Sequence, residues 1–216
     1  MKNKTMFEEY TGRETLKEHG FQVFHDKDIR KVVLNYPTDL ESMVSKLKSD
    51  DVFRTKLGDI KQIQNLNFGG LNRMLVDLIA PGRDFDLLNN QYFCKPGHYK
   101  ETSAHQDNAY FESDSEVYTF WIPLQDVDIH NSCMFYVPGS HKEGLVQHDV
   151  IGTNVRTRTG KKGFSLYSSV YKNKDYLAVP MPAGNILVHD KNTMHFSSPN
   201  LSDSYRIAIT AIVKLK

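Results

Sequence analysis

The segment SAHQDNAYF, residues 103–111, places a histidine and an aspartate two positions apart, at His105 and Asp107. In an extended strand, residues i and i+2 point to the same face, so these two side chains should project together while Gln106 faces away. An imidazole and a carboxylate supply part of the facial triad of two histidines and one carboxylate that holds non-haem Fe(II) and leaves positions open. Such a pair is common by chance, so a metal site requires a second histidine from elsewhere in the chain.

The C-terminal segment NILVHDKNTMHFSSPNLSDSYRIAIT, residues 185–210, offers His189 and His195 as that second histidine. Eleven residues after His195, Arg206 begins an apolar strand pattern in which small side chains share its face. An arginine placed in this way can hold a carboxylate through two parallel hydrogen bonds. The alternative is a surface arginine on a polar strand face.

Composition indicates an ordinary globular protein. The chain has 216 residues, of which 39% are hydrophobic and 25% charged, and its formal net charge is +1. This charge gives no electrostatic reason to expect a nucleic-acid or membrane-surface partner. Cys94 and Cys133 are too few for a disulfide framework, so we expect buried thiols in a reducing compartment. Without an apolar run of signal-peptide or membrane-spanning length, the expected location is the cytoplasm.

The hydrophobic pattern changes near Leu87. Before it, helical spacing or helix-forming composition predicts helices over residues 6–20, 38–51 and 69–82, the first ending at Gly20. After it, short aromatic and β-branched runs alternate with Pro and Gly, which is typical of strands joined by tight turns. We therefore predict one domain over residues 1–216, with residues 1–86 as a mainly helical cover and residues 87–216 as a jelly-roll core.

Four segments between about residues 71 and 213 resemble, in order, the phytanoyl-CoA dioxygenase family of Fe(II)- and 2-oxoglutarate-dependent oxygenases. They are the approach LVDLIAPGRDFDLLNNQYFCKPG, the motif AHQDNAY, the strand pair FWIPLQDVDIHNSCMFYVPGSHKEG and the C-terminal segment that contains His195 and Arg206. One departure is Asn131-Ser132, where the family often has Asn-Gly, and we expect it to change only a turn. The fold implied is mainly β with N-terminal helices, a double-stranded β-helix of the jelly-roll, cupin-like type.

The resemblance also implies the residues of the site. His105, Asp107 and His195 would bind Fe(II), and Arg206 would hold the distal carboxylate of 2-oxoglutarate. Three further residues would contact or lie near that cosubstrate: Ser197, Trp121 and Gln91.

The implied reaction uses O2 and 2-oxoglutarate, releases succinate and CO2, and hydroxylates an unactivated C–H bond of a small metabolite or natural-product intermediate. The carboxylate of Asp107 favours hydroxylation over halogenation, because related halogenases have a small residue at that position. Desaturation, cyclisation and epoxidation are alternative outcomes of the same iron–oxygen chemistry. A non-oxidative cupin-like metal enzyme would have no use for Arg206 as a carboxylate clamp. A non-catalytic binding module would keep a complete set of buried ligands at a cost in stability.

Three other features have weaker interpretations. We expect His189 to be a half-buried histidine bonded to its neighbours. His141, in the turn PGSH, is expected to be structural, with a substrate contact at the pocket mouth as the alternative. The basic segment around Arg156 and Arg158 is expected to be a solvated loop within residues 154–176. The competing hypothesis is a lid whose cations attract an acidic substrate.

Overall fold

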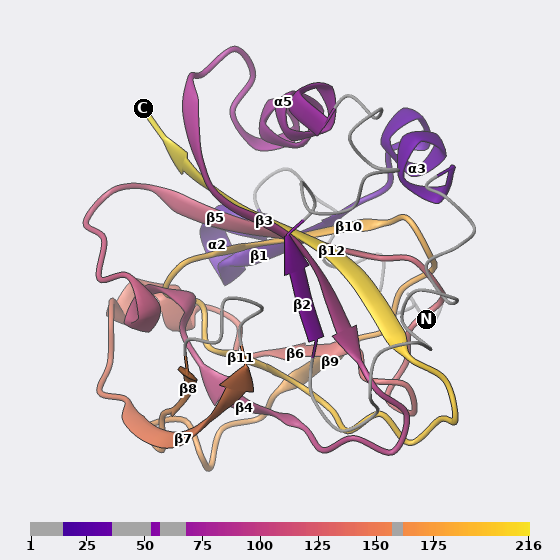
Figure 1. Cartoon of the computed structure of the whole chain (residues 1–216). Coiled ribbons are helices and arrows are strands. Elements are labelled where there is room, and N and C mark those ends of the chain that lie inside the picture. Colours follow the sequence, from indigo (N-terminus) through magenta and orange to yellow (C-terminus); the bar gives the residue numbers. More distant parts are fainter. Residues whose placement is uncertain (1–14, 36–52, 57–67, 157–161) are drawn as a thin grey trace, which may run out of the picture.

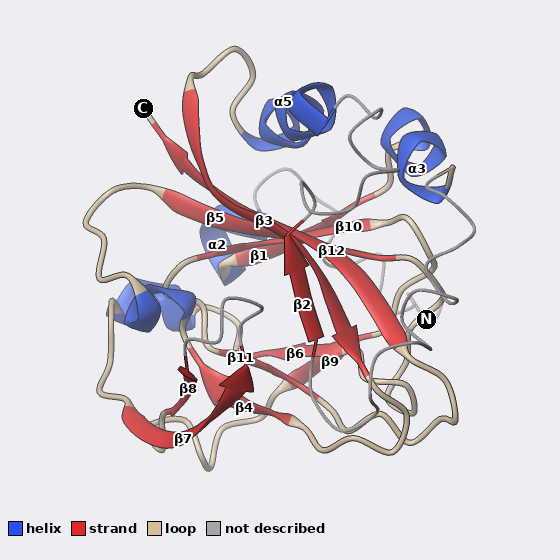
Figure 2. Ribbon diagram, in the orientation of Figure 1, coloured by secondary structure: helices blue, strands red, loops and turns tan. Residues whose placement is uncertain are grey.

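The computed structural model describes residues 15–35, 53–56, 68–156 and 162–216. Two antiparallel sheets face each other, and α3 (Lys27–Leu34) and α5 (Phe68–Ile79) lie on the outer side of the larger one (Figures 1 and 2). The other helices are α2 (Thr15–His19) and two short 3-10 helices, η2 (Asp107–Tyr110) and η3 (Ser140–Glu143). The strands are β1 (Phe21–Phe24), β2 (Phe53–Lys56), β3 (Phe85–Lys95), β4 (Thr102–His105), β5 (Val117–Pro123), β6 (Met134–Tyr136), β7 (Asp149–Arg156), β8 (Lys162–Tyr167), β9 (Leu177–Val179), β10 (Ile186–Asp190), β11 (His195–Ser197) and β12 (Arg206–Leu215).

The strand order is that of a double-stranded β-helix. The larger sheet runs β1-β10-β5-β12-β3-β2, the smaller one runs β4-β11-β6-β9, and β7 and β8 form a separate pair. All the named pairings are antiparallel, and strands distant in sequence are neighbours in space. The predicted mainly-β jelly roll is confirmed.

Strand β12 shows why the two faces of the larger sheet differ. Its residues Ile207, Ile209, Ala211 and Val213 belong to the core cluster shared with α3 and α5. Alternate side chains point to opposite faces of a strand, so Ala208 instead packs in the second cluster, between the two sheets. The polar residues of this inner face lie at the cavity described below, as the strand pattern predicted.

Two of the predicted helices are present where the structure is described. Helix α2 ends at His19, directly before the predicted glycine cap. Gly20 has a φ of +84°, which suits glycine, and its N–H donates to Leu16 O at 2.9 Å. Helix α5 buries Leu71 and Leu75 completely, at 2% and 0% exposure. The predicted helix over residues 38–51 lies outside the described residues, as do residues 6–14 of the first prediction.

The N-terminal part contributes more than a helical cover. Strand β1 pairs with β10, and β2 pairs with β3, so both extend the larger sheet. Helix α3 was also not anticipated, although Asp26 caps it by accepting from the N–H groups of Asp28 and Ile29 at 2.9 and 2.8 Å. These elements have four or eight residues, so their sequences carry little periodic signal.

The two cysteine thiols are free and buried, as predicted. Burial raises the pKa of Cys94 to about 12 and that of Cys133 to about 11. In the described ranges, no helix combines the length and the apolar character needed to cross a membrane.

Candidate metal centre and cosubstrate site

The three predicted metal ligands come together where the smaller sheet meets η2. His105 is the last residue of β4 and pairs directly with His195, the first residue of β11. Asp107 does not lie in a strand, contrary to the expectation, because η2 begins at this residue. The backbone at Gln106 is still extended, with φ −110° and ψ 136°, so the side chains of residues 105 and 107 leave the chain on the same side.

Gln106 points the other way, as predicted, and anchors this corner of the chain. Its side-chain amide donates to Gly144 O at 2.8 Å and to Asn192 O at 2.6 Å, and its Oε1 accepts from the N–H of Val146. The residue is fully buried. Its hydrogen bonds therefore fix the backbone between the two ligands on either side of it.

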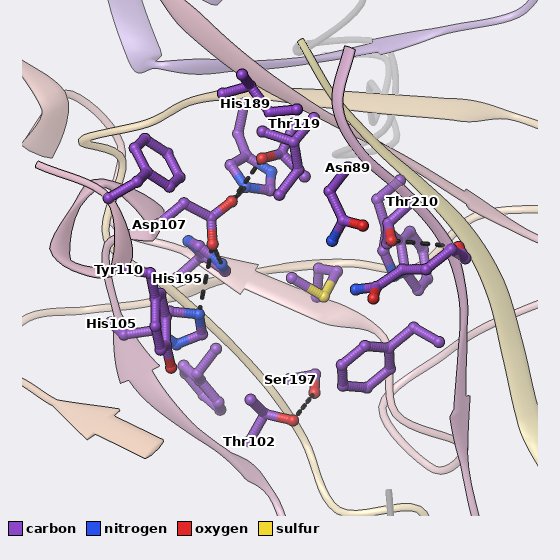
Figure 3. Close-up of a pocket in the computed structure, with 18 of the residues that line it drawn as sticks. Asn89, Thr102, His105, Asp107, Tyr110, Thr119, His189, His195, Ser197 and Thr210 are labelled. Carbon is purple, nitrogen blue, oxygen red and sulfur yellow. Dashed lines mark hydrogen bonds and ion pairs between the residues drawn. The ribbon is translucent and has the colours of Figure 1, made fainter. Parts of the chain in front are cut away.

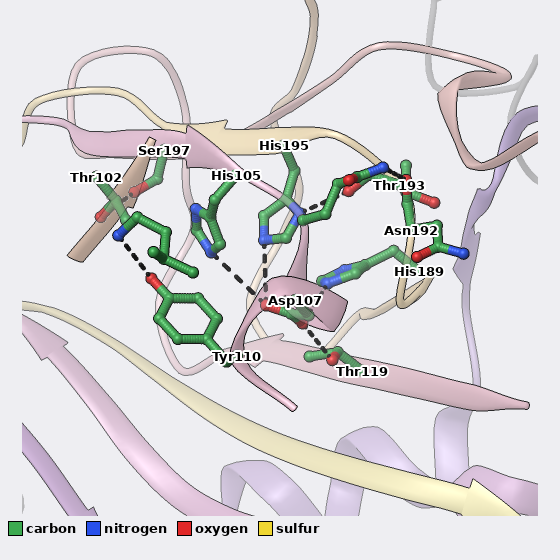
Figure 4. A network of polar contacts seen from close by, with 12 residues as sticks. Thr102, His105, Asp107, Tyr110, Thr119, His189, Asn192, Thr193, His195 and Ser197 are labelled. Atoms are coloured by element: carbon green, nitrogen blue, oxygen red, sulfur yellow. Dashed lines mark hydrogen bonds and ion pairs between the residues drawn. The ribbon is translucent and has the colours of Figure 1, made fainter. Parts of the chain in front are cut away.

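The ligand atoms have the spacing of a metal site. The three candidate donor atoms lie within 4.8 Å of one another. Oδ1 of Asp107 is 3.6 Å from Nε2 of His105 and 3.7 Å from Nε2 of His195 (Figure 4). Two imidazole nitrogens and one carboxylate oxygen on one face are the donor set of non-haem Fe(II) proteins.

Hydrogen bonds set the tautomers of both histidines. Nδ1 of His105 lies 2.7 Å from Ser103 O, and Nδ1 of His195 lies 2.9 Å from Thr193 O. A carbonyl oxygen can only accept, so each Nδ1 carries the proton and each Nε2 presents its lone pair to the site. Burial and the neighbouring histidines lower the pKa of His195 well below its usual value, which keeps this ring neutral and able to bind a metal.

Asp107 is held by its second oxygen. Oδ2 accepts from the hydroxyl of Thr119 at 2.5 Å and lies 3.0 Å from Nε2 of His189, which leaves Oδ1 for a metal. The hydroxyl of Tyr136 lies 2.9 Å from Nδ1 of His189. With Tyr136 donating to Nδ1, His189 has its proton on Nε2 and donates to Asp107. His189 is therefore a fully buried supporting residue, at 1% exposure, rather than the half-buried residue expected.

These contacts keep the carboxylate ionised. Burial by itself would raise the pKa of Asp107, but the surrounding imidazoles of His105, His189 and His195 outweigh it. The pKa of Asp107 consequently lies well below its usual value. Asp107 can bind a cation as a carboxylate throughout the neutral range.

The ligands line one side of a cavity of about 610 Å³ between the two sheets. Figure 3 shows His105, Asp107 and His195 together on one side of it, with Asn89 and Thr210 on the other. The four residues predicted to contact or lie near a cosubstrate also line this cavity: Gln91, Trp121, Ser197 and Arg206. The fold thus brings both predicted groups of residues into one space.

Arg206 is buried without an anionic partner. The residue is 1% exposed, and its Nε and Nη1 atoms have no hydrogen-bond partner. Its guanidinium lies 5.1 Å from the ring centroid of Trp121 and 5.3 Å from that of Phe93, in cation–π geometry. Burial lowers the pKa of Arg206 to about 10, so the group stays charged at neutral pH. Unpaired buried donors are costly, and a bound carboxylate would satisfy them.

Among the candidate substrate residues, only His141 has a described side chain, and it does not line this cavity. His141 lies in η3, where Nε2 is 3.1 Å from Lys17 O, and it is not among the described residues that line the cavity. Arg158 lies outside the described residues, and for Arg156 only the backbone, at the end of β7, is described. The expected loop over residues 154–176 instead contains the end of β7 and all of β8. The lid hypothesis remains a prediction.

Three supporting residues were missed in the sequence: Lys95, Thr119 and Tyr136. Strand parity could have indicated two of them. Lys95 is two and four residues from the cavity residues Phe93 and Gln91, and Thr119 is two residues from Trp121. No comparable signal marks Tyr136, because its role depends on contact with a distant strand.

A jelly roll that encloses two histidines and one carboxylate beside a buried arginine is the architecture of the iron- and 2-oxoglutarate-dependent oxygenases. The family model described as Phytanoyl-CoA dioxygenase (PhyH) matches residues 5–208. The chain therefore belongs to the phytanoyl-CoA dioxygenase family, as the sequence motifs predicted.

Similar proteins support this assignment. A phytanoyl-CoA dioxygenase of Arabidopsis thaliana is 28% identical over 206 residues, which cover 86% of this chain and 70% of that protein. Several other curated relatives match over less than half of their own length. EvdO2 from Micromonospora carbonacea var. aurantiaca, solved with 2-oxoglutarate, has a TM-score of 0.72 at 18% identity, covering 94% of this chain and 89% of its own. The epimerase SnoN was solved with Fe3+, alpha ketoglutarate and nogalamycin RO. It has a TM-score of 0.63 at 18% identity, and the match covers 96% of this chain and 83% of the SnoN chain.

Proposed function

We propose that this protein is an Fe(II)- and 2-oxoglutarate-dependent oxygenase that hydroxylates an unactivated C–H bond of a small molecule. One observation carries the proposal: the cavity that contains His105, Asp107 and His195 also contains the buried, unpaired guanidinium of Arg206. A non-oxidative metal enzyme would need the first group but not the second. A keto diacid fits both, because its keto-acid end can bind a metal while its far carboxylate takes the guanidinium.

Each group of residues has a distinct task in this proposal. His105, Asp107 and His195 hold Fe(II), which together with 2-oxoglutarate and O2 supplies the oxidising power for the C–H bond. Thr119 and His189 keep the carboxylate of Asp107 oriented through its second oxygen.

The carboxylate at position 107 supports hydroxylation as the outcome. Its Oδ1 faces the Nε2 atoms of both histidines, so it takes the ligand position that a halogenase would leave to chloride. Desaturation, cyclisation and epimerisation give products that differ in mass from a hydroxylated one, and the experiment below separates them. Epoxidation adds one oxygen, as hydroxylation does, so the NMR spectrum of the product distinguishes these two outcomes.

The rest of the cavity lining supports a substrate whose enclosed part is uncharged. Beside the metal ligands and Arg206, the described lining includes Leu88, Asn89, Phe111 and Ile212. These side chains offer apolar surface and one neutral amide. An acidic substrate, as the lid hypothesis requires, would depend on Arg156 and Arg158, and the described lining contains no cation besides Arg206 and the histidines.

The test uses purified protein with Fe(II), ascorbate, 2-oxoglutarate and a panel of small natural-product intermediates. We expect succinate to form only when a true substrate is present, together with a product heavier by one oxygen. A product lighter by two hydrogens would indicate desaturation or cyclisation, and a product of unchanged mass would indicate epimerisation. Failure of the metal-loaded protein to bind 2-oxoglutarate under anaerobic conditions would contradict the proposal.

A further inference from the structure

Lys95 is a second buried cation beside the cosubstrate site. It ends β3 and lies directly opposite Arg206 in the antiparallel register with β12. Lys95 is 0% exposed and Arg206 is 1% exposed. Within the described part of the chain, neither side chain forms an ion pair. Charging both groups without a counter-charge would be unfavourable, so this pair fits an anion in the functional complex.

The hydrogen bonds of Lys95 lead to the cavity wall. Its Nζ donates to Ser197 Oγ at 2.7 Å and to Ser198 O at 2.9 Å. An amine bound in this way takes up an acceptor position of the Ser197 hydroxyl, which must direct its own hydrogen elsewhere. That hydrogen goes to Thr102 Oγ1, at 3.0 Å. Ser197 and Thr102 line the cavity, whereas Lys95 lies behind them.

We propose that Lys95 is a positioning residue for the distal carboxylate of 2-oxoglutarate. With an anion bound, it adds a second positive charge next to Arg206. By occupying an acceptor position of the Ser197 hydroxyl, it also leaves that hydroxyl free to turn its hydrogen from Thr102 to a bound carboxylate. This inference rests on the proposed function, since it assumes that a keto diacid binds at Arg206.

The electrostatics of the site agree with this role. Burial and the charge of Arg206 lower the pKa of Lys95 to about 6, while Glu101, an exposed residue, acts in the opposite direction. A carboxylate bound at Arg206 would offset both the burial and the repulsion. Binding of the dianion should therefore favour the ammonium form of Lys95.

The test compares two keto acids on two forms of the protein. One is 2-oxoglutarate, and the other is 2-oxopentanoate, which has a methyl group where 2-oxoglutarate has its distal carboxylate. Binding to the Co2+-loaded protein is measured for the wild type and for Lys95→Met. We expect the substitution to raise the dissociation constant of 2-oxoglutarate about 10- to 100-fold, which is the range of a charge-assisted contact. The dissociation constant of 2-oxopentanoate should change by no more than about twofold. In turnover, KM for 2-oxoglutarate should rise while kcat changes little.

Two further variants separate this role from a structural one. Lys191 is also buried, and its Nζ donates to Ser113 O and Ser115 O, so Lys191→Met removes a comparable buried lysine away from the cavity wall. It should leave the preference for 2-oxoglutarate unchanged. Lys95→Gln keeps a donor without the charge and is expected to fold even if the methionine variant does not. Its loss of affinity should be intermediate and again confined to 2-oxoglutarate.

Equal weakening of both keto acids in the Lys95 variants, or no weakening of 2-oxoglutarate, would overturn the inference while leaving the proposed function intact. A wild-type protein that binds the two keto acids equally well would instead overturn the proposed function, and the inference with it.

Discussion

Replacing Thr119 by valine should weaken metal binding without removing any metal ligand. The hydroxyl of Thr119 donates to Oδ2 of Asp107 at 2.5 Å, and the residue is only 6% exposed. Valine has nearly the same shape and suits a β-strand, so the substitution removes one hydrogen bond with little repacking. Asp107 then keeps only His189 as a donor to this oxygen.

The expected loss follows from the type of hydrogen bond. A hydrogen bond to an ionised group contributes about 1.5–3 kcal/mol, which corresponds to roughly 10- to 100-fold in an equilibrium constant. Supporting hydrogen bonds of metal ligands typically have effects of about 10- to 100-fold on metal affinity, so the two estimates agree. We therefore expect the dissociation constant for Co2+ to rise by about one to two orders of magnitude.

The assay is titration of the metal-free protein with Co2+ without 2-oxoglutarate, followed by calorimetry or by visible absorption. Thr210→Val is the matched control, since this threonine also lines the cavity but donates to Gln91 O at 3.3 Å. Thr119→Ser should retain most of the affinity. If Thr119→Val binds Co2+ as tightly as the wild type, or if Thr210→Val loses as much, the orienting role of Thr119 is wrong.

Three further outcomes are expected. Arg206→Met should abolish measurable 2-oxoglutarate binding. The dissociation constant for Co2+ should stay within a few-fold of the wild-type value, because the guanidinium contacts no metal ligand among the described hydrogen bonds. Equal loss of 2-oxoglutarate and Co2+ binding would contradict the role of Arg206. Tyr136→Phe removes the donor that sets the tautomer of His189, so Co2+ affinity should fall, and an unchanged titration would exclude this role. In the unfolded chain Lys95 stays protonated up to about pH 10.5, whereas in the folded protein its pKa is about 6. Between these two pH values the unfolded state binds more protons than the folded state. The free energy of unfolding should therefore increase with pH from about 6 to about 10.5. Urea unfolding of Lys95→Met at several pH values should show a weaker increase, and parallel curves would contradict the assignment.

Much of the fold could be predicted because local patterns are strong where strands are long and half-buried. Alternation along residues 206–213 places the same side chains on the same faces in the structure as in the sequence. Helix α5 and the end of α2 before Gly20 follow from helical spacing and a glycine cap. Strands β1 and β2 escaped prediction because four residues carry almost no periodic signal, and their pairing depends on distant partners.

The sequence by itself determined which residues could serve as ligands. The spacing in AHQD and the interval from His195 to Arg206 are local properties, and family motifs can be read from them. Only the tertiary structure decided how those residues are supported. The contacts of Thr119 and His189 with Asp107, of Tyr136 with His189, and of Lys95 with Ser197 each join different elements, and the paired residues are 12 to 102 positions apart in the chain. A buried hydrogen bond requires two groups within about 3 Å, and no local sequence pattern specifies that distance.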